Sequence, residues 1–88
     1  MAPEKLLRIT IPESIEYHDI FDDTFAHYLK SYESVGVKTT GMGSMFRLSF
    51  KIVMKDPAEE KALIDELRTK NGNLEIAITP YTDVQNQL

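Results

Sequence analysis

The sequence predicts an α+β domain with a ferredoxin-like βαββαβ fold, in which a four-stranded antiparallel sheet carries two helices on one face. Two stretches of apolar–polar alternation, 7–11 and 46–55, are typical of strands with one buried face. A helical spacing of apolar residues follows each stretch. The order strand, helix, strand, strand, helix, strand is packed most economically as one sheet, with the first and third strands in its centre and the others at its edges.

The first half of the chain is expected to contain a strand, a helix and a second strand. The first strand turns three aliphatic side chains toward the core: Leu7, Ile9 and Ile11. Between residues 16 and 32, apolar residues recur at three- and four-residue steps, which predicts one amphipathic helix with an aromatic stripe. The short β-branched run at 35–40 is expected to form the second strand.

The second half is expected to begin with a hairpin turn at 41–44, because paired glycines permit positive φ angles. The third strand then buries a row of side chains beneath both helices: Phe46, Leu48, Phe50 and Ile52. Asp56 followed by Pro57 is typical of a helix start. The Asn71-Gly72 pair is typical of a helix end.

The last strand is expected at 73–79, where Pro80 ends it. We therefore expect a single domain over residues 1–80, followed by a polar C-terminal tail at 81–88.

Composition excludes several functional classes. The 88 residues carry 14 acidic and 10 basic side chains, for a net charge of −4, which argues against a nucleic-acid partner because that binding depends on positive charge. The absence of cysteine excludes disulfides, thiolate zinc sites and cysteine nucleophiles. No apolar stretch approaches the length of a membrane span.

The sequence offers no catalytic or metal-binding constellation. His18 and His27 are nine residues apart on the predicted first helix, so they are expected to point to opposite sides of it, and no nucleophile motif accompanies them. Four acidic residues gather at the start of this helix: Glu16, Asp19, Asp22 and Asp23. The helix dipole explains them, and no glycine-bearing calcium loop follows. We expect no enzyme, no metal and no cofactor.

One candidate site would bind an anion. Arg8, Arg47 and Lys51 are expected to cluster on the sheet face that the helices leave open, where a basic patch can bind phosphate or carboxylate groups. The residues of the turn can aim backbone N–H groups at the same anion: Thr40, Gly41, Gly43 and Ser44. Both features have a structural alternative, because a tight turn needs the same glycines and Glu75 can pair with Arg8.

Segments 37–48 and 60–76, VKTTGMGSMFRL and EKALIDELRTKNGNLEI, resemble a known family. It is the C-terminal soluble domain of an uncharacterised family of bacterial multi-pass membrane proteins, which carry a domain of unknown function and are often encoded beside polyphosphate-polymerase-like proteins. Segments 9–13 and 21–23 also fit, so the resemblance covers most of the chain. It implies a domain on the cytoplasmic side of the bacterial cell membrane, attached to the membrane through an N-terminal part missing here.

The expected topology is similar, more remotely, to that of ACT-like regulatory domains. Many ACT domains bind amino acids near a glycine-containing turn after the first strand. The corresponding segment here, 12–16, contains no glycine. The resemblance therefore implies a regulatory role more than an amino-acid ligand.

These observations favour a non-enzymatic regulatory or assembly domain that forms a homo-oligomer, most simply a two-fold dimer. The expected interface is the open sheet face or an edge strand at 35–40 or 74–79. The alternative is an anion-sensing module that binds phosphate or polyphosphate on the open face and the glycine-rich turn. The genomic neighbourhood implied by the resemblance is the reason to prefer phosphate over other anions.

Overall fold

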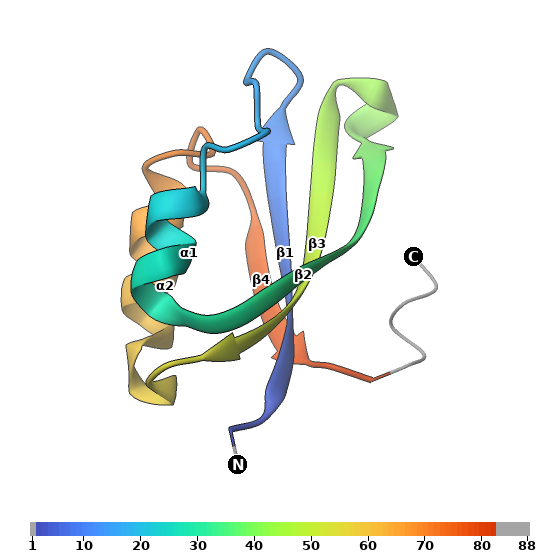
Figure 1. Cartoon of the computed structure of the whole chain (residues 1–88). Coiled ribbons are helices and arrows are strands. Elements are labelled where there is room, and N and C mark those ends of the chain that lie inside the picture. The colour runs from blue at the N-terminus through green and yellow to red at the C-terminus, as the bar shows by residue number, and fades with distance from the viewer. Residues whose placement is uncertain (1, 83–88) are drawn as a thin grey trace.

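Two helices lie on one side of a four-stranded antiparallel sheet in the computed structural model, which describes residues 2–82 (Figure 1). The strands are β1 (Glu4–Pro12), β2 (Leu29–Thr40), β3 (Met45–Met54) and β4 (Ile76–Pro80), and the helices are α1 (Asp22–Tyr28) and α2 (Glu60–Arg68). The strand order is β2-β3-β1-β4. The predicted α+β class is confirmed, and β1 and β3 lie in the centre of the sheet as expected.

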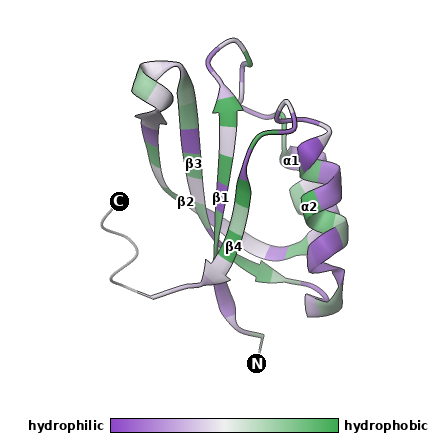
Figure 2. Ribbon diagram, turned by 180° about the vertical axis from the view of Figure 1, so that it is seen from behind, coloured by the Kyte–Doolittle hydropathy of each residue, from purple (hydrophilic) through white to green (hydrophobic). Residues whose placement is uncertain are grey.

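The core lies between the sheet and the helices. Polar and apolar residues alternate along the strands (Figure 2), and the predicted core face of β1 is confirmed, because Leu7, Ile9 and Ile11 are fully buried. On β3, Leu48 and Ile52 are buried. Phe46 and Phe50 are only partly buried, so the prediction of a fully covered row on this strand is wrong at these two positions.

The first helix is much shorter than the sequence predicted. The helix expected over 16–32 is confined to Asp22–Tyr28, and the chain from Leu29 onward is strand β2, twelve residues long. The cause is pairing with β3, because Tyr32 lies opposite Ile52 and its ring packs 4.8 Å from that of Phe25. The aromatic stripe is therefore shared between a helix and a strand. Phe50 packs against Phe25 of α1, with ring centroids 5.1 Å apart, and Phe46 packs against Tyr17 at 5.9 Å.

Strand β2 contains two register irregularities, one of which decides which side chains reach the open face. Ser34 pairs with Phe50 and Gly36 pairs with Ser49, so Val35 is an extra residue with no partner in register. Such a bulge reverses the alternation of the residues that follow it. Lys38 consequently lies opposite Arg47 on the open face.

The predicted cap of the second helix at Asp56 is confirmed, but α2 itself begins at Glu60 and ends at Arg68, before the predicted Asn71-Gly72 end. The side chain of Asp56 accepts a hydrogen bond from the Ala58 amide at 2.9 Å, and a short 3-10 turn, Pro57–Glu59, leads into α2. After α2, Gly72 has a φ angle of 74°. Asn71 is fully buried, and its Nδ2 donates to the carbonyl oxygens of Thr10 at 2.8 Å and Leu74 at 3.2 Å. This side chain joins the end of α2 to the sheet.

The last strand starts three residues later than predicted. Residues 73–75 belong to the connection from α2, and β4 begins at Ile76. The backbone N–H of Tyr81 donates to the carbonyl of Glu4 at 3.2 Å, so this residue, predicted to begin the tail, still pairs with β1. The remainder of the predicted tail, from residue 83, lies outside the described residues.

Candidate functional site

The open face of the sheet carries three rows of side chains that run across the strands. The first row contains Glu75, Thr10, Arg47 and Lys38. The second row contains Ala77, Arg8, Ser49 and Gly36. The third row contains Thr79, Leu6, Lys51 and Glu33. The middle row therefore holds one long side chain, that of Arg8, among three small residues.

Ser49 lies at the centre of this arrangement. Its neighbours two positions away on β3 are Arg47 and Lys51, and Arg8 lies directly opposite on β1. Gly36, opposite on β2, has no side chain. Ser49 is fully buried and its Oγ has no hydrogen-bond partner, and Arg8 Nε is likewise buried without a partner. Buried polar atoms are usually paired, so two unpaired donors side by side are uncommon.

The basic side chains of this face differ in their electrostatic surroundings. Lys51 Nζ lies 3.3 Å from a Glu33 carboxylate oxygen and 3.8 Å from that of Glu4. These contacts, chiefly the hydrogen bond and charge of Glu33, raise the pKa of Lys51. The positive charge of Lys51 is therefore already compensated.

Arg8, Arg47 and Lys38 make no ion pair within residues 2–82. The alternative expected from the sequence, pairing of Arg8 with Glu75, thus does not occur in this part of the chain. Among the described residues, the open face therefore carries three cations without an ion-pair partner.

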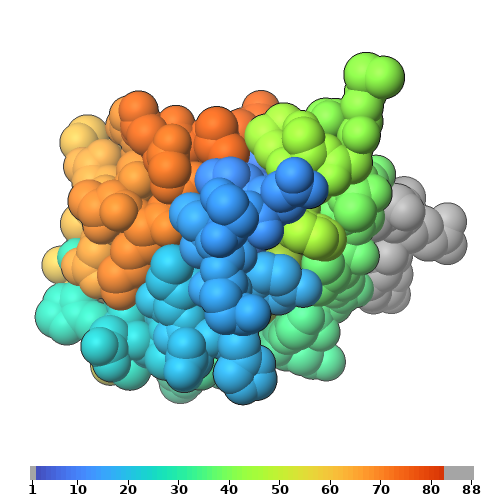
Figure 3. Space-filling view, turned by 90° about the horizontal axis from the view of Figure 1, so that it is seen from above, coloured from blue at the N-terminus to red at the C-terminus, as the bar shows by residue number. Residues whose placement is uncertain are grey.

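The glycine-rich turn joins β2 to β3 and stands out from the surface beyond the ends of these strands (Figure 3). Gly41, Met42 and Gly43 have φ angles of 57°, 57° and 89°. Ser44 Oγ donates to the Gly41 carbonyl at 2.7 Å, so this hydroxyl is already used inside the turn. The predicted hairpin turn is confirmed, and the geometry explains the glycines without a ligand.

Thr40 is a predicted turn residue that lies beside Arg47. It shares a shallow hollow of about 190 Å³ with Arg47, Thr10 and Glu75. The structure therefore gathers Arg8, Arg47 and Thr40 on one face of the sheet. Lys51 is on the same face but paired, while the residues of the turn tip lie apart: Gly41, Gly43 and Ser44.

The two histidines lie on different elements of the fold. His18 lies before α1 and its backbone N–H donates to Glu16, whereas His27 lies in the last turn of α1 with its ring 4.6 Å from that of Tyr28. The prediction that one helix carries both is therefore wrong. Residues 2–82 contain no group of three or more acidic or imidazole side chains placed to hold a metal ion. No helix in this range is long and apolar enough to cross a membrane.

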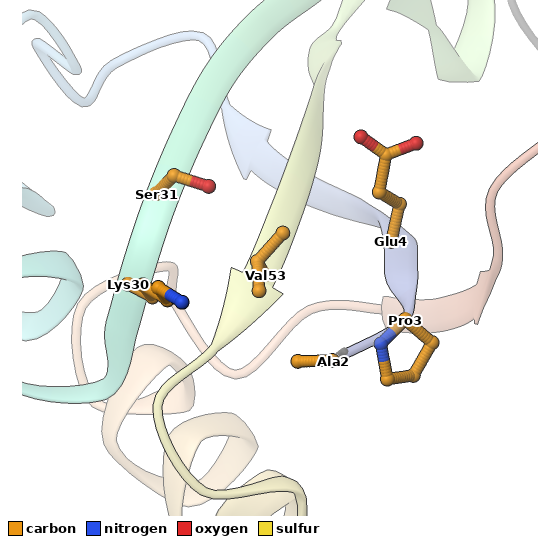
Figure 4. Close-up of a pocket in the computed structure, with 6 residues that line it drawn as sticks. All are labelled: Ala2, Pro3, Glu4, Lys30, Ser31 and Val53. Carbon is orange, nitrogen blue, oxygen red and sulfur yellow. The ribbon is translucent and has the colours of Figure 1, made fainter.

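A hollow of about 550 Å³ forms an open depression where β1 begins (Figure 4). Its lining contains Ala2, Pro3, Glu4, Lys30, Ser31 and Val53. Lys30 is the one cation in this lining, and the Glu4 carboxylate also contacts Lys51. The lining therefore contains one acidic side chain, Glu4, and one basic side chain, Lys30, among small and apolar residues. This set of residues does not indicate a particular reaction.

Comparison with protein-family models gives no match, and searches of curated proteins and of solved structures give none either.

Sequence reasoning did not include Ser49, Lys38 or Gly36 among the candidate site residues. A signal for Ser49 was present, because it alternates with Arg47 and Lys51 along one strand. The positions of Lys38 and Gly36 depend on the bulge at Val35, which the sequence pattern does not reveal.

Proposed function

We propose that the chain is a non-enzymatic assembly and regulatory domain of ferredoxin-like topology, which forms a two-fold dimer through the outer edge of β4. The observation that carries this proposal is the row of backbone groups that β4 turns away from the sheet. The separation of His18 from His27 supports a non-enzymatic role.

The direction of these groups follows from the pairing with β1. Thr10 N–H donates to the Glu75 carbonyl at 3.0 Å, and Tyr81 N–H donates to Glu4. In an antiparallel ladder, alternate residues of an edge strand pair inward and the others point outward. Ile76 and Ile78 therefore point their N–H and C=O groups away from β1.

A second copy of the chain fits this edge. If Ile76 pairs with Ile78 of the second copy, the two-fold axis passes through Ala77, and about four new backbone hydrogen bonds join the two sheets. The strand contains no charged residue and no bulge, and both isoleucines are partly exposed. A flat, uncharged edge of this kind readily adds another strand.

The opposite edge of the sheet is a poorer partner. Strand β2 has two register irregularities, at residues 29–31 and 34–36, and carries Lys30 and Lys38. Bulges and lysines are common means of preventing edge-to-edge pairing. Of the two edges expected from the sequence, 35–40 and 74–79, we therefore favour the second.

The cellular placement proposed for this domain is the cytoplasmic side of a bacterial membrane, as part of a longer membrane protein. It rests on the resemblance of segments 37–48 and 60–76 to the soluble domain of bacterial multi-pass membrane proteins. Attachment to a membrane raises the effective concentration of neighbouring copies, so an isolated domain that dimerises weakly is sufficient for assembly.

The test is the molar mass of variants measured by light scattering up to millimolar concentration. Ile78→Pro removes an outward N–H that β1 does not use, and Ile78→Ala is the matched control for the lost side chain. We expect concentration-dependent dimerisation of the wild type, a weaker dimer for Ile78→Ala and a folded monomer for Ile78→Pro. A wild type that stays monomeric, or an Ile78→Pro variant that dimerises like Ile78→Ala, would overturn the proposal.

A second variant covers the case in which proline prevents folding. Ala77→Glu places two carboxylates opposite each other across the proposed axis, where like charges repel. Within one chain the new carboxylate lies beside Arg8, so the monomer is expected to fold. A dimer of unchanged strength in this variant argues against the β4 interface.

A further inference from the structure

We propose that the open sheet face binds a phosphoryl group through Arg8, Ser49 and Arg47, with Lys38 at the margin of the site. This inference does not depend on dimerisation, because pairing through an edge strand leaves the face of the sheet free.

Two neighbouring donors on this face have no hydrogen-bond partner within residues 2–82. Ser49 Oγ and Arg8 Nε are both buried, both lack a hydrogen-bond partner and belong to residues directly opposite each other in the β1–β3 register. A buried donor without a partner destabilises a fold unless something else accepts from it. One oxyanion seated over Ser49 can accept from both groups.

Three basic side chains on this face have no acidic partner among the described residues. Arg8, Arg47 and Lys38 form no ion pair within the described residues, although the chain is acidic with a net charge of −4. Lys51, in contrast, is held by two carboxylates. Acidic residues therefore compensate one end of the basic face and leave the other end free for a ligand.

The donor groups of this site match a phosphoryl group better than a carboxylate. The site offers donors from two arginines and a hydroxyl, and guanidinium groups bind phosphate and carboxylate through paired hydrogen bonds. A terminal phosphoryl group has three acceptor oxygens and up to two negative charges, whereas a carboxylate has two oxygens and one charge. Three cations without an ion pair among the described residues, one on each of three neighbouring strands, match the phosphoryl group better.

Small residues beside Arg8 and Ser49 leave room for an anion. Gly36 and Ala77 are the small residues of the middle row, and Gly36 lies directly opposite Ser49. The hollow of about 190 Å³ that contains Arg47 and Thr40 adjoins this row. Glu75 also lines that hollow and opposes an anion there.

The experiment is a titration of the full chain with inorganic phosphate, pyrophosphate and acetate, followed by amide chemical shifts. We expect phosphate and pyrophosphate to move the amides of residues 8–10 and 47–49, and acetate to bind at least about tenfold more weakly, because it offers fewer charge-assisted bonds. Tighter binding of pyrophosphate would identify a phosphate chain as the ligand, and equal binding would identify a single phosphoryl group.

Single substitutions test which side chains contact the bound phosphate. Arg8→Gln and Arg47→Gln should each weaken phosphate binding about tenfold or more, and Ser49→Ala a few-fold, since charged hydrogen bonds contribute more than neutral ones. Lys51→Gln is the matched control on the same face and should change binding less than about twofold, because its charge is already paired. Glu75→Gln should tighten binding by removing a repelling carboxylate.

Three results would overturn the proposal. The first is no shift with phosphate or pyrophosphate in the wild type. The second is equal binding of acetate, which would indicate a nonspecific basic surface. The third is a Lys51→Gln variant as defective as Arg47→Gln. Arg8 and Arg47 are both only partly buried, so both variants are expected to fold.

Discussion

Replacement of Asn71 by alanine should destabilise the domain by about 2 kcal/mol. The side chain is fully buried and donates two hydrogen bonds, to the carbonyls of Thr10 and Leu74. Each such bond contributes about 0.5–1.5 kcal/mol, and its loss leaves a carbonyl without that donor. Removal of the unpartnered Oδ1 offsets a small part of the loss. For a domain of this size, the expected fall in melting temperature is roughly 8–16 °C.

Urea unfolding followed by circular dichroism tests this value, provided that the slope of the transition is unchanged. Asn71→Asp is the discriminating variant, because it keeps the volume of the side chain but replaces its donor by an acceptor. It should cost more than alanine, since its carboxylate would face the Thr10 and Leu74 carbonyls. A loss below about 0.5 kcal/mol for alanine, or a milder effect of aspartate than of alanine, would refute this account of Asn71.

Three further predictions concern packing, the turn and pH. Phe25→Ala should cost about 3–5 kcal/mol in urea unfolding, because the ring is buried among three other aromatic rings. Phe50→Ala should cost clearly less, since Phe50 is only partly buried, and equal losses would contradict this. Gly41→Ala should lower the melting temperature, because φ is 57° and the added methyl would meet the Met45 side chain; an unchanged melt would argue against the turn geometry. The glutamate partners of Lys51, chiefly Glu33, raise its pKa. The ion pair therefore stabilises the fold fully below the ordinary lysine pKa, and this stabilisation is lost as the pH rises through the raised pKa. Melts at pH 8 and at about pH 11 should therefore show a smaller alkaline loss for Lys51→Met than for the wild type, and an identical loss in both would contradict the pairing.

The candidate site could be predicted in part. Alternation along 46–55 correctly placed Arg47 and Lys51 on the face opposite Leu48, because side-chain direction in a strand has a period of two. The same alternation could not reveal that Lys51 is paired and Arg47 is not. That difference depends on Glu33 and Glu4, which are distant in sequence and come from the strands on either side of β3.

The amino-acid pattern was sufficient to predict the α+β class, the central position of β1 and β3, the buried face of β1 and the cap at Asp56. These features follow from local periodicity and turn chemistry, which act over a few residues. The length of α1, the bulge at Val35 and the burial of Asn71 depend instead on contacts between segments that are distant in sequence. The helical spacing at 16–32 is a weak preference, and pairing of Leu29–Thr40 with β3 overrides it because backbone hydrogen bonds and aromatic packing act together there. Contacts between distant segments decide such positions, and no local pattern encodes them.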